Sequence, residues 1–193
     1  MQMLKLLSRG EYKTNEGYQA LVTAKQSVKW YKEVWNKMAI PKHMFILWLA
    51  VLDRMQLKER LFRFQIVPDE NCLLCGTKKE TIEHLFFDCH LCYQALNQIK
   101  DWLGWHTAAS TIPKILRWVA KARMTRFRKQ VYSTTVAALV YHLWWCRNEA
   151  LWNHKVYRVS IVVRRIQSNV KNRVRSYMPN KIQHIDQDWF DQL

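Results

Sequence analysis

Glycine, proline and paired carboxylates are scarce in this chain of 193 residues, and each scarcity excludes a class of protein. Four glycines and four prolines are too few for the many tight turns of a β-rich fold. No two aspartates are adjacent, whereas polymerase and RNase H reactions need clustered carboxylates that hold two divalent metals. Neither a phosphate-binding glycine loop nor a Gly-x-Ser-x-Gly elbow is present. We therefore expect a mostly α-helical protein that is not an enzyme.

Long apolar runs and secretory features are missing as well. The longest apolar runs, 44–52 and 136–146, fall short of the roughly 18 residues that a membrane span needs. An odd number of cysteines, five, and the lack of a signal peptide argue against a disulfide framework. Ten tryptophans and an apolar content of 49% are ample for a core. We expect an intracellular protein with no membrane partner.

Acidic residues are nearly absent from one long segment of this basic chain. The net charge is +16, and the stretch from Lys114 to Arg175 holds fifteen Lys/Arg and a single acid, Glu149. Such a block predicts a polyanionic partner, and nucleic acid is the default. A solvated helix surface or a nuclear-import tract would give the same charge pattern. Contacts would go to phosphates of RNA or DNA and carry little sequence information. We expect nuclear rather than cytoplasmic location and nucleic-acid contacts from Arg126, Arg128, Lys129, Arg164, Arg165, Lys171, Arg173 and Arg175.

Apolar residues recur at three- and four-residue steps, which predicts a series of helices. One of them is apolar on every side between Val136 and Trp145, which predicts a central core helix or, alternatively, a docking surface. Ser160 is the predicted N-cap of the last helix. The predicted helices cover 18–38, 42–55, 57–64, 89–104, 112–124, 126–155 and 161–177. The predicted division is a flexible leader (1–17), a small helical zinc-binding domain (18–106), a basic helical region (110–178) and a frayed tail (179–193).

Four potential metal ligands lie within eighteen residues: Cys72, Cys75, His84 and Cys89. Thiolate sulfur and imidazole nitrogen suit tetrahedral zinc, and four protein ligands close the site, which makes it structural rather than hydrolytic. Gly76 permits the tight turn of a zinc knuckle, where a side chain could crowd the metal. The other histidines are scattered and expected in packing or surface positions. They are His43, His106, His142, His154 and His184, with His90 expected to face solvent.

Spacing alone leaves two ligand sets open. Cys89 and Cys92 form a second Cys-x2-Cys pair on one helix face, which would complete a four-cysteine site. His84 and Cys89, in contrast, would be about 140° out of phase in one continuous helix. They can converge on a metal only if the chain breaks between them, and Asp88 could then cap the following helix.

The residues around His84 carry a family resemblance. The block Glu80-Thr81-Ile82-Glu83-His84-Leu85-Phe86-Phe87-Asp88-Cys89 resembles the Glu-Thr-x-x-His-Leu-Phe-Phe-x-Cys block of the plant reverse transcriptase zinc-binding domain. That domain follows the polymerase core in LINE-like non-LTR retroelements. The resemblance covers residues 18–105 well and 110–155 loosely. Shorter matching blocks are Ile40-Pro41-Lys42-His43, Lys58-Glu59-Arg60-Leu61 and Trp144-Trp145-Cys146-Arg147-Asn148.

This resemblance implies that one structural zinc is held by Cys72, Cys75, His84 and Cys89, and that Cys92 is a buried free thiol. Leu57 and Leu96 depart from the family pattern without touching a ligand. The implied function is a nucleic-acid-associated module from the C-terminal part of a retroelement reverse transcriptase, without its catalytic core. A polymerase core is then a possible partner. Alternatives are a zinc-stabilised protein–protein scaffold that docks through 136–146, or an inactive transposon relic.

Overall fold

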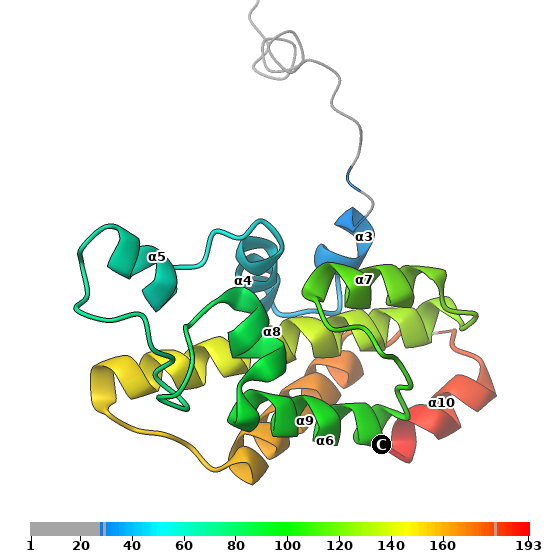
Figure 1. The fold of residues 1–193 in the computed structure, drawn as a ribbon. Helices are drawn as coiled ribbons and strands as arrows, with labels where there is room; N and C mark the ends of the chain where they lie inside the picture. The colour runs from blue at the N-terminus through cyan, green and yellow to red at the C-terminus, as the bar shows by residue number, and fades with distance from the viewer. Residues whose placement is uncertain (1–27, 29, 180) are drawn as a thin grey trace, which may run out of the picture.

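The computed structural model describes residues 28, 30–179 and 181–193, and within them the chain is mostly helical (Figure 1). No strand forms in this part of the chain, which has one isolated antiparallel bridge between Asn71 and Lys79. The mostly α-helical fold class is confirmed. The elements are α3 (Tyr31–Val34), α4 (Pro41–Val51), α5 (Lys58–Arg63), the π-helical turn η1 (His84–Asp88), α6 (His90–Leu103), α7 (Ile112–Lys121), α8 (Arg126–Asn153), α9 (Val159–Ser176) and α10 (His184–Asp191).

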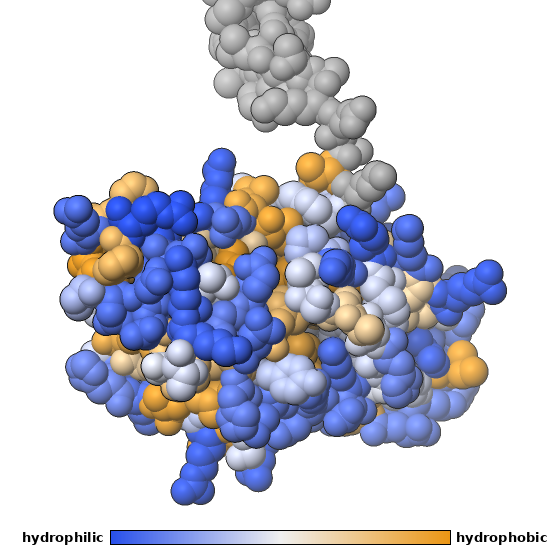
Figure 2. Space-filling view, in the orientation of Figure 1, coloured by the Kyte–Doolittle hydropathy of each residue, from blue (hydrophilic) through white to orange (hydrophobic). Residues whose placement is uncertain are grey.

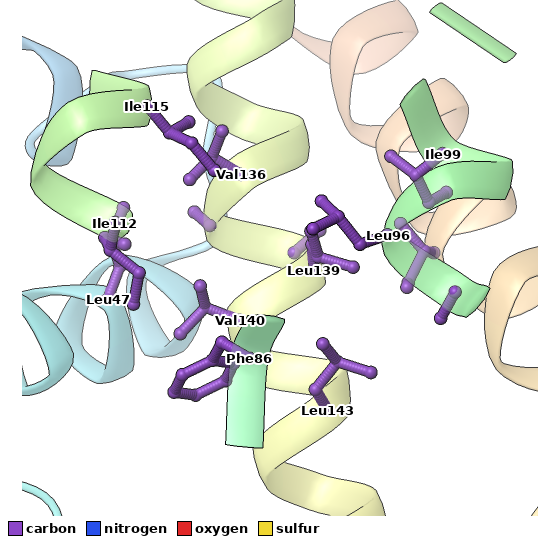
Figure 3. Packing of buried hydrophobic residues seen from close by; sticks show 14 of the residues in the cluster. Leu47, Phe86, Leu96, Ile99, Ile112, Ile115, Val136, Leu139, Val140 and Leu143 are labelled. Carbon is purple, nitrogen blue, oxygen red and sulfur yellow. The ribbon is translucent and has the colours of Figure 1, made fainter. Parts of the chain in front are cut away.

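Helix α8 is the centre of the fold. It contacts α4, α6, α7, α9 and η1, so it is surrounded along much of its length. Figure 3 shows Val136, Leu139, Val140 and Leu143 of α8 between side chains from α4, α6, α7 and η1. All four are at most 4% exposed. The core-helix interpretation of the apolar run is therefore confirmed for most of its length, while Tyr141, Trp144 and Trp145 are half-buried.

Several helix ends follow the signals in the sequence. Pro41 opens α4, where its missing N–H costs nothing. Gly104 ends α6 in the left-handed conformation, with φ +60°, as a C-cap glycine does. The Thr111 and Thr125 side chains accept hydrogen bonds from backbone N–H groups of α7 and α8. The predicted cap at Ser160 is wrong, because extended Arg158 takes the N-cap position and α9 begins at Val159.

Helix α10 packs against α8, so the expectation of a frayed tail is wrong for His184–Asp191. Phe190 of α10 is 1% exposed and lies edge-on to Phe127, with ring centroids 6.0 Å apart. The Asp186 carboxylate is buried and accepts a hydrogen bond from Arg128 Nε at 2.7 Å. The guanidinium of Arg128 also lies over the ring of Trp189, 4.8 Å from its centroid. An apolar anchor and a matched ion pair thus hold a segment that looks polar in sequence.

The N-terminal predictions fall partly outside the described residues. The leader at 1–17 and the first part of the helix predicted over 18–38 lie there. In the described part of that helix, α3 ends at Val34 because Asn36 turns the chain onto α8. Its amide nitrogen donates to Gln130 O at 2.7 Å and to Thr134 Oγ1 at 2.9 Å. Its Oδ1 accepts from Met38 N, which competes with helical hydrogen bonding.

Helices on both sides of the predicted linker share one hydrophobic core. Whether 18–106 and 110–178 are separate domains stays a prediction. Within the described residues no helix is both long enough and apolar enough to cross a membrane.

Candidate metal centre

The first two candidate ligands lie on a short loop with a knuckle-like turn. Cys72 N donates to Lys78 O at 2.7 Å, and Gly76 N donates to Cys72 O at 2.8 Å. Gly76 has φ +69°, a conformation that side chains disfavour. A Cβ added there would meet no atom within 4 Å. The glycine is therefore needed for its backbone conformation, and the expected crowding of a bound metal by a side chain stays a prediction.

The second pair of candidate ligands converges because the chain breaks between helices. His84 begins the π-helical turn η1, and its N–H is held by Thr81 Oγ1 at 3.0 Å. Cys89 has extended backbone angles, φ −65° and ψ 122°, and takes the N-cap position of α6. The break that the phase argument requires is thus present. Asp88 does not cap α6, since it closes η1 instead.

The four side chains come together as a metal site would require. The sulfur atoms of Cys72, Cys75 and Cys89 and a ring nitrogen of His84 all lie within 4.8 Å of one another. Cys72 Sγ and Cys89 Sγ are 4.0 Å apart, and Cys75 Sγ lies 3.3 Å from His84 Nε2. A tetrahedral zinc with usual bond lengths places two sulfurs about 3.8 Å apart and sulfur and nitrogen about 3.6 Å apart. The residues therefore fit one zinc ion, with Nε2 as the ligand atom of His84.

Burial and electrostatics agree with a closed site. Cys72, His84 and Cys89 are buried and Cys75 is half-buried. A hydrogen bond with Cys89, and then burial, raise the pKa of the Cys72 thiol far above its usual range. A divalent cation among these sulfurs would lower the pKa of the thiols instead, because a thiol that coordinates a metal is deprotonated outright.

The two remaining cysteines, Cys92 and Cys146, and the other histidines lie outside this group. Cys92 is 1% exposed and is not among the four clustered side chains, so the geometry favours the histidine set over the four-cysteine set. His43 is buried, and desolvation followed by the charges of His142 and Lys42 lowers its pKa to about 3. His142 is buried too, whereas the side chains of the others reach solvent: His90, His106, His154 and His184.

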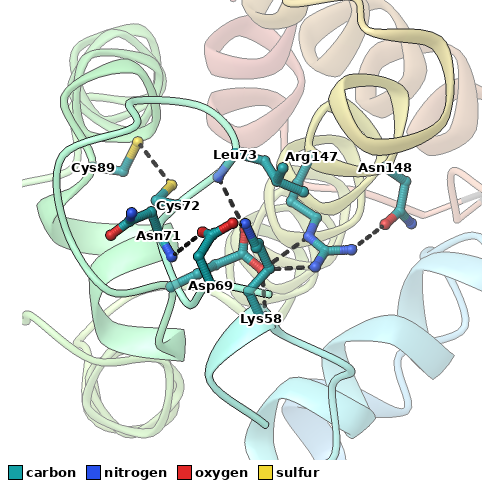
Figure 4. Close-up of polar contacts among 9 residues, drawn as sticks. Lys58, Asp69, Asn71, Cys72, Leu73, Cys89, Arg147 and Asn148 are labelled. Atoms are coloured by element: carbon teal, nitrogen blue, oxygen red, sulfur yellow. Dashed lines mark hydrogen bonds and ion pairs between the residues drawn. The ribbon is translucent and has the colours of Figure 1, made fainter. Parts of the chain in front are cut away.

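A buried ion pair joins the candidate metal loop to α8, and sequence reasoning missed it. Arg147 donates from Nε and Nη2 to Glu80 Oε1, at 3.0 and 2.7 Å (Figure 4). The same carboxylate accepts from Lys58 N at 2.8 Å and from Leu73 N at 3.3 Å. Glu80 is 0% exposed and Arg147 is 2% exposed. Both residues lie in blocks that carry the family resemblance, and this shared position is the one sequence signal that could have pointed to the pair.

The eight basic residues predicted to contact nucleic acid lie on two helices, and half of them have other partners. Arg128 is paired with Asp186, and Lys129 Nζ donates to Ala120 O at 2.7 Å. Arg165 lies over the Trp145 ring at 4.3 Å, and Arg173 lies over the Tyr177 ring at 3.6 Å. The others make no hydrogen bond or ion pair with described residues: Arg126, Arg164, Lys171 and Arg175.

Comparison with known proteins agrees with the geometry of the metal loop. Residues 12–95 match a family described as zinc-binding in reverse transcriptase. This segment contains all four clustered side chains and Glu80. The matched family is a zinc-binding segment and not a catalytic polymerase or RNase H domain. No curated protein and no solved structure matches the chain.

Proposed function

We propose that this chain is a structural zinc-binding, nucleic-acid-associated module, similar to the C-terminal part of a LINE-like retroelement reverse transcriptase and without its catalytic core. The observation that carries the proposal is the cluster of three thiols and one imidazole within 4.8 Å. Four protein ligands leave no open position for a reacting water, so the zinc has a structural role. The matched family supports the reverse transcriptase context.

Charge supports the nucleic-acid part of the proposal. Arg126, Arg164 and Arg175 are exposed, and α9 carries most of the predicted contacts around an apolar stripe that faces the core. Exposed guanidinium groups can approach phosphates without losing an internal partner. Such contacts are electrostatic and largely independent of sequence. They suit a partner met in the nucleus, RNA or DNA.

A protein–protein scaffold is the second candidate function, and one surface feature favours it. Phe62, Phe64 and Ile66 are 44%, 67% and 66% exposed at the end of α5. Figure 2 shows apolar atoms on the surface in this region. This patch, and not the buried run 136–146, would dock a polymerase core or another protein. Docking of this kind would be nearly insensitive to salt, which separates it from phosphate binding.

Salt dependence therefore tests the proposed function. We expect the zinc-loaded chain to bind duplex and single-stranded oligonucleotides with log Kd rising linearly with log salt. Each neutralised phosphate contributes a slope of about 0.9 on duplex DNA and about 0.7 on single strands. The double variant Arg164→Gln/Arg175→Gln should lower the slope by about one unit per residue replaced. The slope is measured by fluorescence anisotropy titrations between about 50 and 200 mM salt, a range over which electrostatic binding to nucleic acid weakens strongly.

A matched control separates local contacts from net charge. Arg54 and Lys78 are also exposed, and the pair Arg54→Gln/Lys78→Gln removes the same charge from surfaces away from α9. The salt slope of this control should equal that of wild type, apart from the small decrease that the lower net charge causes. Binding that is absent at low salt, or that does not change with salt, would contradict the nucleic-acid proposal.

A further inference from the structure

A groove lies between α3 and the start of α8, with a volume of about 490 Å³. Its lining combines exposed cations with exposed aromatic rings. Lys32 and Lys37 come from α3 and the segment after it, Arg126 comes from α8, and Tyr31 and Trp35 contribute rings. Most of these residues lie outside the sequence-predicted contacts. The groove is therefore a surface that the charge pattern alone did not identify.

The floor of the groove is fixed by buried polar contacts. Asn36 is 5% exposed, and its amide holds the segment after α3 against Gln130 and Thr134 of α8. Val34, 0% exposed, anchors α3 in the core on the side away from the groove. The two walls are thus held in position, which limits the ordering cost that a ligand would have to overcome.

The charge of the groove favours a polyanion. Four basic residues line it, since half-buried Lys129 joins Lys32, Lys37 and Arg126. Glu33 is the single acid among the described residues of the lining, and one of its carboxylate oxygens is shielded from solvent. A second hollow of about 400 Å³ shares Arg126 and Gln130 with the first and extends toward Lys181. Lys181 adds one cation past Arg126, and the Asp186 carboxylate in the same lining is already paired with Arg128.

The aromatic rings indicate which polyanion fits. Tyr31 is 56% exposed and Trp35 is 41% exposed, so each ring offers surface to a ligand. Trp35 is supported from behind by Trp48, with ring centroids 6.2 Å apart. Exposed rings beside cations bind single strands, because unpaired bases stack on the rings while the cations contact phosphates. The bases of a duplex are already stacked on each other and cannot use these rings.

We propose that the groove between α3 and α8 binds single-stranded nucleic acid, with Tyr31 and Trp35 stacking on bases and Lys32, Lys37 and Arg126 contacting phosphates. This inference rests on the proposed nucleic-acid function and specifies its site and substrate class. Binding is tolerant of sequence, since every base has a face for stacking. Helix α9 then supplies additional phosphate contacts that do not distinguish single strands from duplex.

Two matched double variants test the groove. Tyr31→Ala/Trp35→Ala removes the groove rings, and Tyr93→Ala/Trp152→Ala removes one tyrosine and one tryptophan that are similarly exposed, at 51% and 74%, outside the groove. Anisotropy titrations use labelled U12, dT12 and a U12·A12 duplex, oligomers of about the length that single-strand grooves cover. We expect the groove variant to bind the preferred single strand about tenfold or more weakly, and duplex within about twofold of wild type. The control variant should match wild type on all three.

Charge reversal adds a variant that leaves Trp35 and its packing intact. Lys32→Glu/Lys37→Glu should weaken single-strand binding more than Arg54→Glu/Lys78→Glu, which makes the same charge change elsewhere. Equal weakening by both pairs, or equal losses from both aromatic variants, would overturn the groove assignment while leaving salt-dependent binding and the proposed function in place. If wild-type protein binds none of the three oligonucleotides at low salt, both proposals fail. The U12 and dT12 titrations show whether the bound strand is RNA or DNA.

Discussion

Replacing Arg147 with methionine is expected to lower the free energy of unfolding by about 3–5 kcal/mol. The substitution leaves the Glu80 carboxylate buried with its two backbone donors, Lys58 N and Leu73 N, but without a compensating cation. An uncompensated buried charge is among the few single changes with so large an effect. Urea unfolding curves of wild type and variant, fitted with the same m value, give the difference in the free energy of unfolding.

Three further variants show whether the effect belongs to the buried pair. Arg147→Lys keeps the charge and loses the two-nitrogen contact, so it should fall between wild type and Arg147→Met. Glu80→Met/Arg147→Met should recover part of the loss, because no buried charge remains. Arg63→Met breaks the exposed pair with Glu59 and should cost no more than about 1 kcal/mol. If Arg147→Met and Arg63→Met are equally stable, the Glu80–Arg147 pair does not hold the zinc loop, residues 70–92, on α8.

Removing zinc is expected to have the largest effect of any change on the loop at 70–92. Apart from the Glu80 contacts, few backbone hydrogen bonds hold its first half, residues 70–80, together, chiefly Cys72 N to Lys78 O and Glu80 N to Glu70 O. Structural zinc supplies on the order of 10 kcal/mol in zinc-finger peptides, which is comparable to the whole stability of a typical domain. After chelation we expect hydrogen exchange to accelerate by orders of magnitude in this loop and the Tm to fall, with recovery on adding zinc.

Cys89 and Cys92 offer a matched pair of thiols for this prediction. They are 0% and 1% exposed and lie at the start of the same helix. Cys89→Ser should reproduce the effect of chelation on exchange in the loop, whereas Cys92→Ser should behave like wild type. Slow exchange in the loop after complete removal of zinc would show that packing alone holds it, and the structural role of the metal would be wrong.

The sequence anticipated much of the metal loop because its signals are local. The spacing of Cys72, Cys75, His84 and Cys89 identifies the cluster, and the phase mismatch between His84 and Cys89 requires the break found at the end of η1. The capping role of Gly104 and the burial of Val136 likewise follow from local conformation and periodicity. The choice between His84 and Cys92 came from resemblance, because spacing allows both.

Features that depend on contacts between residues distant in sequence could not be predicted from such local signals. Arg147 reaches Glu80 across 67 positions, and Asn36 reaches Thr134 across 98. The order of the C-terminal segment depends on Phe190 and Asp186 finding partners on α8. Hydrophobic periodicity places a residue on a face of its own helix but does not say which other helix meets that face.

The family match ends at residue 95, yet the loop that it contains is held by a residue beyond it. Arg147 lies on α8, and α8 also provides one wall of the proposed groove. In this chain the zinc loop and the basic helices are therefore parts of one packed structure. That arrangement gives a physical reason for a zinc site in a module whose proposed contacts with nucleic acid lie on other elements: the metal would fix one side of the support for α8.

Zinc K-edge X-ray absorption on the purified chain, together with its zinc content, tests the metal centre most directly. We predict one zinc per chain, with three sulfur ligands at about 2.3 Å and one nitrogen ligand at about 2.0–2.1 Å. His84→Ala should lose the nitrogen ligand or the metal. Four sulfur ligands in the wild-type protein would place Cys92 in the site instead of His84. A chain that retains no zinc under reducing conditions would contradict the metal centre altogether.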